Sequence, residues 1–198
     1  MFVTFEGVDW SGKSTQAKLL AAWLRGQGRI VQTSREPGGT PVGEAVRALV
    51  LHGEEMTPWT EAALYAAARA ENAERIIRPA LERGEDVVCD RYLDSSIAYQ
   101  GAGRGLGEER VRELSLTVTR GLLPDRTFLV LLDPEQAESR ARGDRDRIER
   151  EGGQFMRVVD AAYRALAARE PERIVAVDGA REAEEIAEEV RERVRPLL

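Results

Sequence analysis

The sequence predicts an α/β protein with a five-stranded parallel sheet surrounded by helices. Three observations favour this fold class. Short β-rich runs alternate with longer amphipathic segments along the 198 residues, as in open sheets with right-handed crossovers. Several of these runs, such as FLVLL, are apolar at every position, which suits strands that are covered on both faces. A glycine-rich loop, GVDWSGKST, separates the first run from the first amphipathic segment.

The strands are expected at the β-rich runs, and the helices fill the intervals between them. The strand candidates are 2–6, 30–34, 86–90, 127–133 and 173–178. The helix candidates are 13–26, 42–51, 61–83, 108–120, 134–142, 155–168 and 182–195. Ligands of such sheets bind beyond the carboxyl ends of the strands, so function is sought in the loops that follow the strands.

Two stretches have no strands of their own. A helical insertion occupies about 41–83, between the second and third strands. The stretch at about 140–154 is dense in charge and ends in Gly-Gly, which favours a short mobile lid. No repeat, low-complexity tract or linker divides the chain, so 1–198 is expected to form one domain with these two mobile sub-elements.

The composition limits the classes of partner. A formal net charge of -6 argues against nucleic-acid binding, which usually requires a basic footprint. The single cysteine, Cys89, excludes an intramolecular disulfide and fits a cytoplasmic protein. No leader-like segment and no apolar run of membrane-spanning length is apparent, so no membrane partner is expected.

The glycine-rich loop after the first strand has the spacing of a phosphate loop. Its glycines let backbone N–H groups converge on phosphate oxygens, and the helix that follows adds the positive end of its dipole. Lys13 is expected to reach the β- and γ-phosphates, and the Ser14 hydroxyl to bind Mg²⁺. A glycine-rich turn with a chance Gly-Lys-Ser is the alternative. The expected phosphate-binding residues are Gly7, Val8, Asp9, Trp10, Ser11, Gly12, Lys13, Ser14 and Thr15.

Asp90 and Arg91 follow the third expected strand. If that strand neighbours the first, Asp90 lies beside the phosphate loop, where it can hold Mg²⁺ directly or through water. Capping the next helix is the alternative for Asp90. Arg91 is well placed to bind a second phosphate with two parallel hydrogen bonds.

The phosphate loop does not by itself identify the reaction, because GTPase switches, assembly ATPases and small-molecule kinases share it. A guanine-specific Asn-Lys-x-Asp is missing, since the only asparagine, Asn72, has no lysine after it. ATPase motors are usually larger. A compact kinase is therefore favoured, and a nucleotide-dependent switch or partner-binding ATPase is the alternative.

Five segments, in this order, closely resemble the bacterial thymidylate kinase family: FEGVDWSGKSTQ, REPGGT, ALYAAARAEN, DRYLDSSIAYQGAGRG and RARGDRDRIE. The resemblance covers essentially the whole chain, and DRY-x-x-S-x-x-AYQG is specific to that family. It implies a P-loop kinase fold and a cytoplasmic, homodimeric enzyme that transfers the γ-phosphoryl group of ATP to dTMP with Mg²⁺, giving dTDP and ADP. A kinase for another nucleotide or for a deoxynucleoside is the alternative among enzymes.

Matched residue by residue, the resemblance implies a phosphate site for dTMP. Arg35 and Arg91 would bind the 5′-phosphate, and Glu36 and Pro37 would form the turn that presents Arg35. Asp9 would lie near the sugar of the acceptor and the metal.

The resemblance also implies a site for the base. Tyr65 would stack on thymine, and Arg69, one helical turn further, would donate to a thymine carbonyl. Ser96 and Gln100 would face the base edge, while Tyr99 would pack under the sugar and disfavour a ribose 2′-hydroxyl. The alternatives are a core position for Tyr65, a surface charge for Arg69 and a flexible turn at Gln100.

Phosphoryl transfer also needs a cation where charge builds up on the oxygens. One branch of the family has an arginine in the phosphate loop, at the position of Trp10, and another has arginines in a lid. This chain fits the second branch, although a small residue is usual there, so Trp10 can contact the lid, the acceptor or neither.

The match to the lid sequence selects Arg140, Arg142 and Arg147. The alternative is a solvated helix face with ion pairs. The expected catalytic residues are therefore Asp9, Lys13, Arg91, Arg140, Arg142 and Arg147. Arg181, after the last strand, is expected near the adenine.

Overall fold

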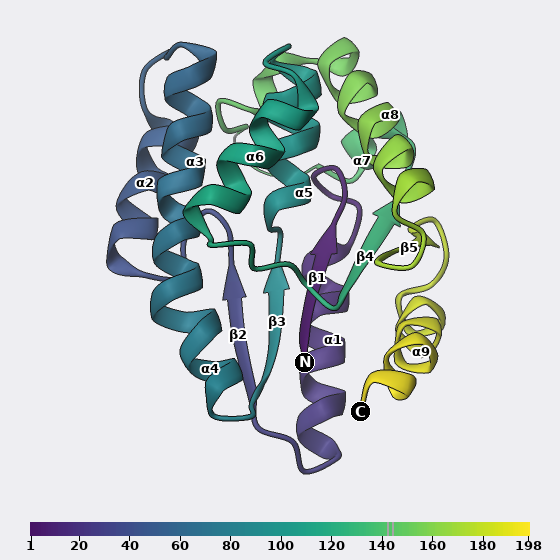
Figure 1. Cartoon of the computed structure of the whole chain (residues 1–198). Coiled ribbons are helices and arrows are strands. Elements are labelled where there is room, and N and C mark those ends of the chain that lie inside the picture. The colour runs from purple at the N-terminus through teal and green to yellow at the C-terminus, as the bar shows by residue number, and fades with distance from the viewer. Residues whose placement is uncertain (142, 144) are drawn as a thin grey trace.

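The computed structural model describes residues 1–141, 143 and 145–198. Its centre is a parallel sheet of five strands in the order β2-β3-β1-β4-β5 (Figure 1). The strands are β1 Phe2–Glu6, β2 Val31–Arg35, β3 Asp86–Asp90, β4 Arg126–Leu131 and β5 Ile174–Asp178. The predicted five-stranded parallel sheet is confirmed, and each predicted strand overlaps an observed one.

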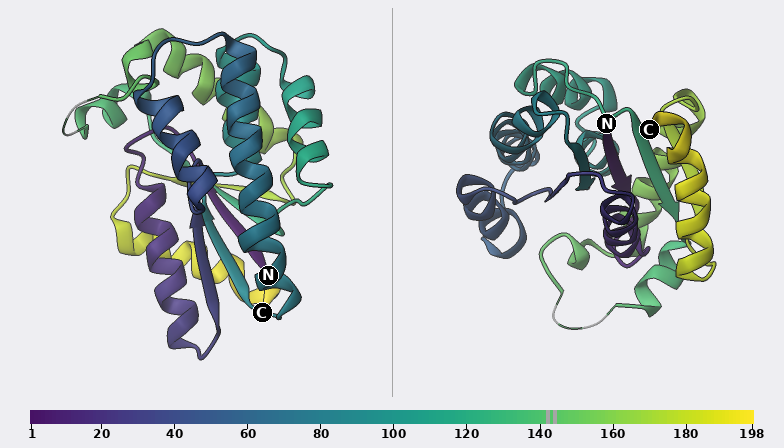
Figure 2. Two further views of the ribbon diagram at one scale, coloured as in Figure 1. Left: turned by 90° about the vertical axis from the view of Figure 1, so that its left-hand side faces the viewer. Right: turned by 90° about the horizontal axis from the view of Figure 1, so that it is seen from below.

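Helices cover both faces of the sheet, as the two further views show (Figure 2). Two helices, α1 Lys13–Gly26 and α9 Ala183–Val194, pack on one face. The other face carries α2 Pro41–His52, α3 Pro58–Asn72, α4 Arg78–Glu82, α5 Leu93–Ser96, α6 Glu108–Val118 and α8 Gly153–Arg169. A short helix, α7 Pro134–Ser139, leads from β4 towards the expected lid.

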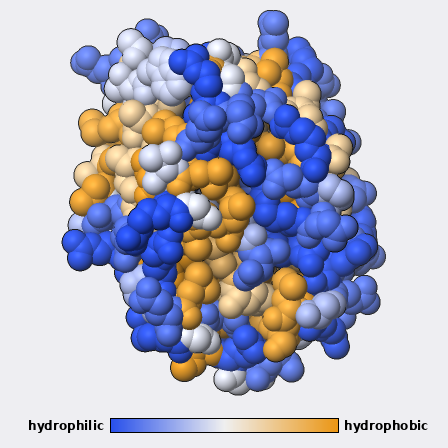
Figure 3. Space-filling model, viewed as in Figure 1, coloured by the Kyte–Doolittle hydropathy of each residue, from blue (hydrophilic) through white to orange (hydrophobic). Residues whose placement is uncertain are grey.

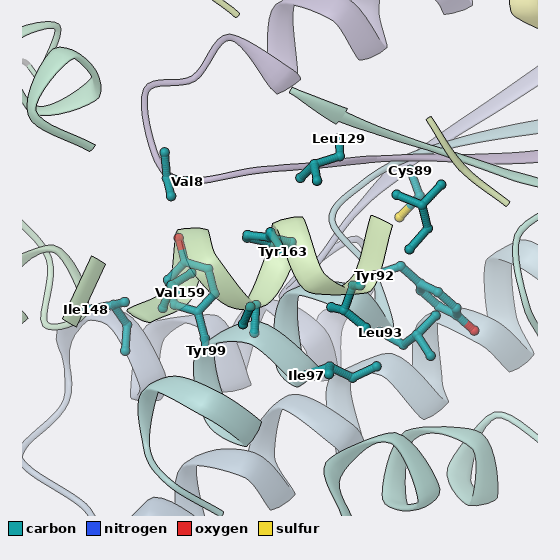
Figure 4. Close-up of a cluster of buried hydrophobic side chains, with 14 of the residues drawn as sticks. Val8, Cys89, Tyr92, Leu93, Ile97, Tyr99, Leu129, Ile148, Val159 and Tyr163 are labelled. Carbon is teal, nitrogen blue, oxygen red and sulfur yellow. The ribbon is translucent and has the colours of Figure 1, made fainter. Parts of the chain in front are cut away.

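Each face of the sheet has its own apolar core. Val3, Phe5 and Phe128 pack against α1 and α9. On the opposite face, Tyr163 of α8 lies between the sheet and α5 (Figure 4). Burial on both faces explains why the inner strands β1, β3 and β4 are largely apolar without alternation. Polar groups gather beyond the carboxyl ends of the strands and on the helices that border them.

Three helical segments differ from the sequence-based prediction. The predicted helix at 61–83 begins earlier, at Pro58, and passes through a π-helical stretch, Ala73–Ile77, before α4. No helix was predicted after β3, but α5 and a π-helical stretch, Ile97–Gly103, lie there. The predicted helix at 134–142 ends at Ser139.

Among the described residues, no helix is both long enough and apolar enough to cross a membrane.

Candidate active site

The phosphate loop connects β1 to α1 and depends on two glycines. Gly7 has φ 140°, and a Cβ there would lie 2.5 Å from the carbonyl oxygen of Val130. Gly12 has φ 100° and precedes the first residue of α1 without offering a side chain to cap the helix. The first N–H groups of a helix have no partners within the helix. The loop therefore presents uncapped donors and the positive end of the α1 dipole to an anion.

Lys13, Asp9 and Arg91 form a charged triad beside this loop, in which Lys13 is buried and Asp9 and Arg91 are partly buried. Lys13 Nζ lies 3.4 Å from Asp9 Oδ1, and Arg91 Nη2 donates to the same oxygen at 2.5 Å. Burial opposes ionisation of Asp9, but the charges of Arg91 and Lys13 outweigh it and hold its pKa well below the usual range. Burial and the charge of Arg91 lower the pKa of the Lys13 ammonium. One carboxylate thus fixes two cations at the end of the phosphate loop.

Arg91 is held from the other side by a second carboxylate, Glu6, through two hydroxyl groups. Arg91 Nη1 donates to Ser95 Oγ at 3.0 Å and to the Tyr163 hydroxyl at 3.3 Å. Both hydroxyls donate to Glu6 Oε2, at 2.5 Å and 3.1 Å. Burial, together with the charge of Asp94, raises the pKa of Glu6 to about 7. These partners set the orientation of the Arg91 guanidinium.

Two cavities meet at Asp9 and Arg91 of this triad. The first has a volume of about 540 Å³ and lies between β3, α2, α3 and α5. It is lined by Asp9, Glu36, Pro37, Arg47, Leu51, Tyr65, Arg69, Arg91, Tyr92, Ser95, Ser96, Tyr99, Gln100, Asp146 and Ile148. The second is an open cleft of about 1520 Å³ that includes Lys13, Ser14, Arg35 and Asp90. Asp9, Glu36, Arg47 and Arg91 line both cavities, so the two spaces adjoin at these four side chains.

The first cavity gathers nine of the ten predicted acceptor residues: Asp9, Glu36, Pro37, Tyr65, Arg69, Arg91, Ser96, Tyr99 and Gln100. The tenth, Arg35, lies in the open cleft, where its side chain is 55% exposed and pairs with Glu44 at 2.9 Å. Arg47 lines both cavities and was not predicted. It faces inward from α2 one helical turn before Leu51, a spacing that the sequence does show.

Arg69 is buried at the base of the first cavity, not a surface charge. It donates to Glu36 Oε2 at 2.8 Å, Ser115 Oγ at 2.9 Å, and both the Tyr92 carbonyl and Ser96 Oγ at 3.0 Å. These bonds use four of the five N–H groups of a guanidinium. Burial raises the pKa of Glu36, although Arg69 opposes the rise. One N–H of Arg69 remains for a ligand.

Gln100 is also buried, and one end of its amide is already bonded. Its Nε2 donates to Glu61 Oε1 at 2.9 Å, while among the described residues its carbonyl oxygen accepts no hydrogen bond. Tyr65 lines the same cavity, and burial raises the pKa of its phenol, which therefore stays neutral. Tyr99 places its hydroxyl 3.3 Å from Asp9 Oδ2. Within the described part of the chain, the Gln100 carbonyl is thus a free acceptor at a cavity that is also lined by the rings of Tyr65, Tyr92 and Tyr99.

Ser14 and Asp90 line the open cleft together. The register of the sheet places Asp90 beside Phe5, next to the phosphate loop. Asp90 Oδ1 is buried and has no hydrogen-bond partner. The alternative role of Asp90 as a helix cap is not observed, because α5 begins after Tyr92 without a side-chain cap. A hydroxyl and an unsatisfied carboxylate oxygen in one cleft suit Mg²⁺, which favours oxygen ligands and retains several waters.

The predicted lid arginines have different surroundings. Arg140 is exposed, and its Nη1 donates to the carbonyl of Gly179 at 3.1 Å, beside the phosphate loop. Arg147 is buried, with Nη2 2.7 Å from Glu61 Oε2 and Nε donating to the Val50 carbonyl at 2.9 Å. Arg142 lies outside the described residues.

Arg181 pairs with Glu185 and Glu189 on α9. Its chain segment, however, lies near the phosphate loop, because a Cβ on Gly179 would be 3.1 Å from the Ser11 carbonyl oxygen. Trp10 donates to Glu149 in the segment expected as a lid.

A P-loop kinase must hold two phosphate-bearing molecules end to end, and here two cavities adjoin at the phosphate loop. The first cavity has the aromatic rings and the buried amide that a nucleobase requires. Arg91 lines this cavity where it adjoins the open cleft, and Lys13 lies next to Arg91 in that cleft. The fold and the site define the class: a nucleoside monophosphate kinase of the P-loop type.

Comparison with known proteins specifies the family within this class. The family model described as thymidylate kinase matches residues 5–190. A thymidylate kinase of Leifsonia xyli is 55% identical over 96% of this chain and 92% of its own length. One from Clavibacter michiganensis is 50% identical over 100% of this chain and 96% of its own length. The crystal structure of thymidylate kinase from Ehrlichia chaffeensis superposes with a TM-score of 0.82, at 32% identity, over 98% of both chains. The chain belongs to the thymidylate kinase family.

Proposed function

We propose that this chain transfers the γ-phosphoryl group of ATP to dTMP, giving dTDP and ADP. The observation that carries the proposal is the junction of the two cavities at Asp9 and Arg91, with Lys13 beside it in the open cleft. The phosphate loop supports the donor phosphates through the N–H groups of α1 and through Lys13. The first cavity, called the acceptor cavity below, accepts the nucleoside. The 5′-phosphate of the nucleotide points towards Arg91 and the open cleft.

In this arrangement an oxygen of the dTMP phosphate attacks the γ-phosphorus, and the bond between that phosphorus and the β,γ-bridging oxygen breaks. Lys13 and Arg91 lie where negative charge moves during the transfer. Ser14 and Asp90 would hold Mg²⁺, which neutralises the phosphate oxygens when bound. Arg140 contacts Gly179 beside the phosphate loop, so we assign it to the donor phosphates. Arg142 completes the set of lid arginines proposed from the sequence.

Base selection follows from the groups that remain available in the cavity. Thymine offers an N3–H donor and a carbonyl acceptor on adjacent positions of its edge. The free carbonyl of Gln100 accepts the N3–H, and the remaining N–H of Arg69 donates to the carbonyl. Cytosine presents an acceptor at N3, which would face the Gln100 oxygen without a proton between them. Tyr65 supplies the ring that stacks on the base, and Tyr99 packs under the sugar.

The remaining parts of the site bind the rest of both nucleotides. Arg35 and Arg47 are positioned to complete the phosphate site once ligand displaces Glu44 from Arg35. The segment after β5, with Arg181, forms the side of the donor site where the adenine would lie. We place the protein in the cytoplasm, with residues 1–198 as one kinase domain.

We also propose that the protein is a homodimer. From the sequence, the apolar, alanine-rich face of residues 61–80 could bury itself against a partner. Ala62, Ala66 and Ala68, however, are buried in the core of the chain itself. Two of the exposed large apolar residues lie instead on one face of α2, where Val42 is 50% and Leu49 53% exposed. Figure 3 shows hydrophobic residues gathered on the side where Figure 1 places α2 and α3.

A coupled assay of ADP formation with dTMP, dCMP, dAMP and dGMP tests the proposed activity. We expect dTMP to give a kcat/KM at least about 100-fold above the others, since a buried site with unpaired polar groups discriminates by about that factor or more. Equal turnover of another nucleotide would contradict the base assignment. ATP hydrolysis that no monophosphate accelerates would contradict the kinase assignment and favour a switch or partner-binding ATPase.

A further inference from the structure

Trp10 adopts an unusual backbone conformation inside the phosphate loop. Its φ is 65°, in the left-handed region that bulky residues rarely adopt, at a cost of about 1–3 kcal/mol. Its side chain is also 39% exposed. A strained and partly exposed indole in a loop that must follow a nucleotide closely requires compensating contacts.

The ring of Trp10 reaches the turn at 146–149. Its Nε1 donates to Glu149 Oε1 at 3.1 Å. The ring also lines an apolar pocket of about 590 Å³ between the phosphate loop, α7 and the start of α8, together with Ala137 and Met156. The phosphate loop therefore contacts a segment that lies 139 residues further along the chain.

Glu149 is part of a capping box, so its carboxylate is already held in place. Asp146 Oδ1 accepts from the N–H groups of Ile148 and Glu149, at 2.8 Å and 2.9 Å. In return, Glu149 Oε2 accepts from the N–H of Asp146 at 3.0 Å. One carboxylate oxygen closes the turn, and the other accepts the indole N–H of Trp10. The turn thus presents a fixed acceptor to the phosphate loop.

The same turn also forms part of the acceptor cavity. Asp146 and Ile148 line that cavity, and Ile148 packs beside Tyr99 and Val159 in the core (Figure 4). Arg147 ties the turn to the Leu51 carbonyl through its N–H at 2.9 Å and to Glu61 through its side chain. Among the polar contacts of the described residues, only the hydrogen bond from Trp10 to Glu149 joins this turn to the phosphate loop.

We propose that Trp10 is a positioning residue, whose indole N–H docks Glu149 and thereby holds the turn 146–149 against both the phosphate loop and the acceptor cavity. The inference rests on the function proposed above, since this turn matters to catalysis as a shared wall of the two substrate sites. Trp10 then fixes the distance between donor and acceptor without touching the transferred group. A misplacement of reactants by about 1 Å can cost about 100-fold in rate.

Two variants remove the contact from opposite sides. Trp10→Phe keeps an aromatic ring and loses the N–H, and Glu149→Gln keeps one oxygen for the turn and loses the second. We expect each to lower kcat by about 3- to 10-fold, the rate equivalent of one ordinary hydrogen bond in an exposed position. KM for ATP should change much less. Both substitutions remove the same bond. The double variant should therefore lose no more of its kcat than the single variant with the larger loss.

Trp59→Phe is the matched control, because Trp59 is exposed at the start of α3 and stacks on Arg110, away from the site. Its kcat should equal that of the wild type. An unchanged kcat in Trp10→Phe, or losses in the double variant that multiply those of the single variants, would overturn the proposal.

A second measurement does not depend on activity. In a Trp23→Phe/Trp59→Phe background, Trp10 is the only one of the three tryptophans left. Adding Glu149→Gln should increase the quenching of its fluorescence by acrylamide, because the indole is released from the turn. An unchanged quenching constant would overturn the contact. If the wild type does not phosphorylate dTMP, the proposed function fails, and the quenching result still decides whether Trp10 docks the turn.

Discussion

Arg91 lines both cavities of the candidate site. Its backbone has φ 69°, another left-handed position for a bulky residue. The guanidinium is held by Asp9 on one side and by Ser95 and Tyr163 on the other. Such support lets a cation meet a phosphate without reorganising, and reorganisation is a large part of the barrier in charge-transfer steps. The cost of the strained backbone is offset by this network.

Glu6 gives this network a dependence on pH that a stability measurement can detect. Its ordinary pKa is 4.5, and burial, with the charge of Asp94, raises it to about 7 in the folded protein. A raised acid pKa means that the folded state binds a proton more tightly than the unfolded chain does. The contribution of Glu6 to stability is therefore highest below pH 4.5 and falls as pH rises towards and through 7.

We expect the free energy of unfolding in urea to fall between pH 6 and pH 8 (about one unit either side of that pKa) by a larger amount in the wild type than in Glu6→Gln. The glutamine keeps the shape of the side chain and carries no charge to bury. Curves for the two proteins that run parallel over this range would contradict the raised pKa.

At this scale the sequence predicted the residues that line the two cavities better than the residues that hold them in place. Asp9, Arg91 and Tyr99 belong to motifs with fixed spacing, so a motif places them. Glu6 and Tyr163 are 157 residues apart and meet only through the sheet, and nothing local in the sequence distinguishes either from a core residue. Arg35 has a competing partner in Glu44, which a pattern of residue types does not reveal.

At the scale of elements, the segment after β3 shows where local propensity misleads. SSIAYQGAGRG is rich in serine and glycine and reads as a turn, yet Ile97–Gly103 is π-helical. Its glycines allow close packing: a Cβ on Gly101 would lie 2.9 Å from Glu108 Cα, and one on Gly103 would lie 2.7 Å from the Phe155 ring. Tertiary packing therefore decides the structure here. The apolar strands, which lack such conflicts, were predicted within one or two residues at most ends.

The turn at 146–149 contains Arg147, whose surroundings differ from those that the sequence suggested. The sequence suggested Arg147 as a cation over the transferred phosphoryl group. In the structure this side chain pairs with Glu61, which also binds Gln100 and Arg104. Arg147 thus connects the turn to the base-binding end of the acceptor cavity.

We expect Arg147→Ala to raise KM for dTMP by about 10-fold or more, because a buried ion pair that loses one partner costs several kcal/mol and Gln100 is bonded to the abandoned Glu61. Arg150→Ala, an exposed arginine three positions further, is the control and should change neither constant. A fall in kcat of more than about 100-fold with KM for dTMP unchanged would instead support a direct catalytic role.

At the scale of the whole molecule, the chain has a net charge of -6 but binds anionic ligands. Positive charge is concentrated locally: the cations of the site lie at the carboxyl ends of β1, β2 and β3, next to the helix dipole of α1. The outer surfaces carry most of the acidic residues. One surface is different: α2 exposes Val42, Ala45 and Leu49 at helical spacing, with no partner in the described part of the chain.

This stripe leads to a test of the oligomeric state. If α2 and its symmetry mate pack together, Leu49→Glu places like charges across a two-fold axis in an apolar contact, where each loses its water. Light scattering coupled to gel filtration should then give a monomer mass near 22.0 kDa, against twice that mass for the wild type. Val158→Glu is the matched control, since Val158 is 42% exposed on α8, away from α2, and should leave the dimer intact.

A dimeric Leu49→Glu protein would move the interface elsewhere. A wild type that elutes as a monomer would remove the dimer from the proposed function. Because Arg47 and Leu51 of the same helix line the acceptor cavity, loss of the dimer should also raise KM for dTMP.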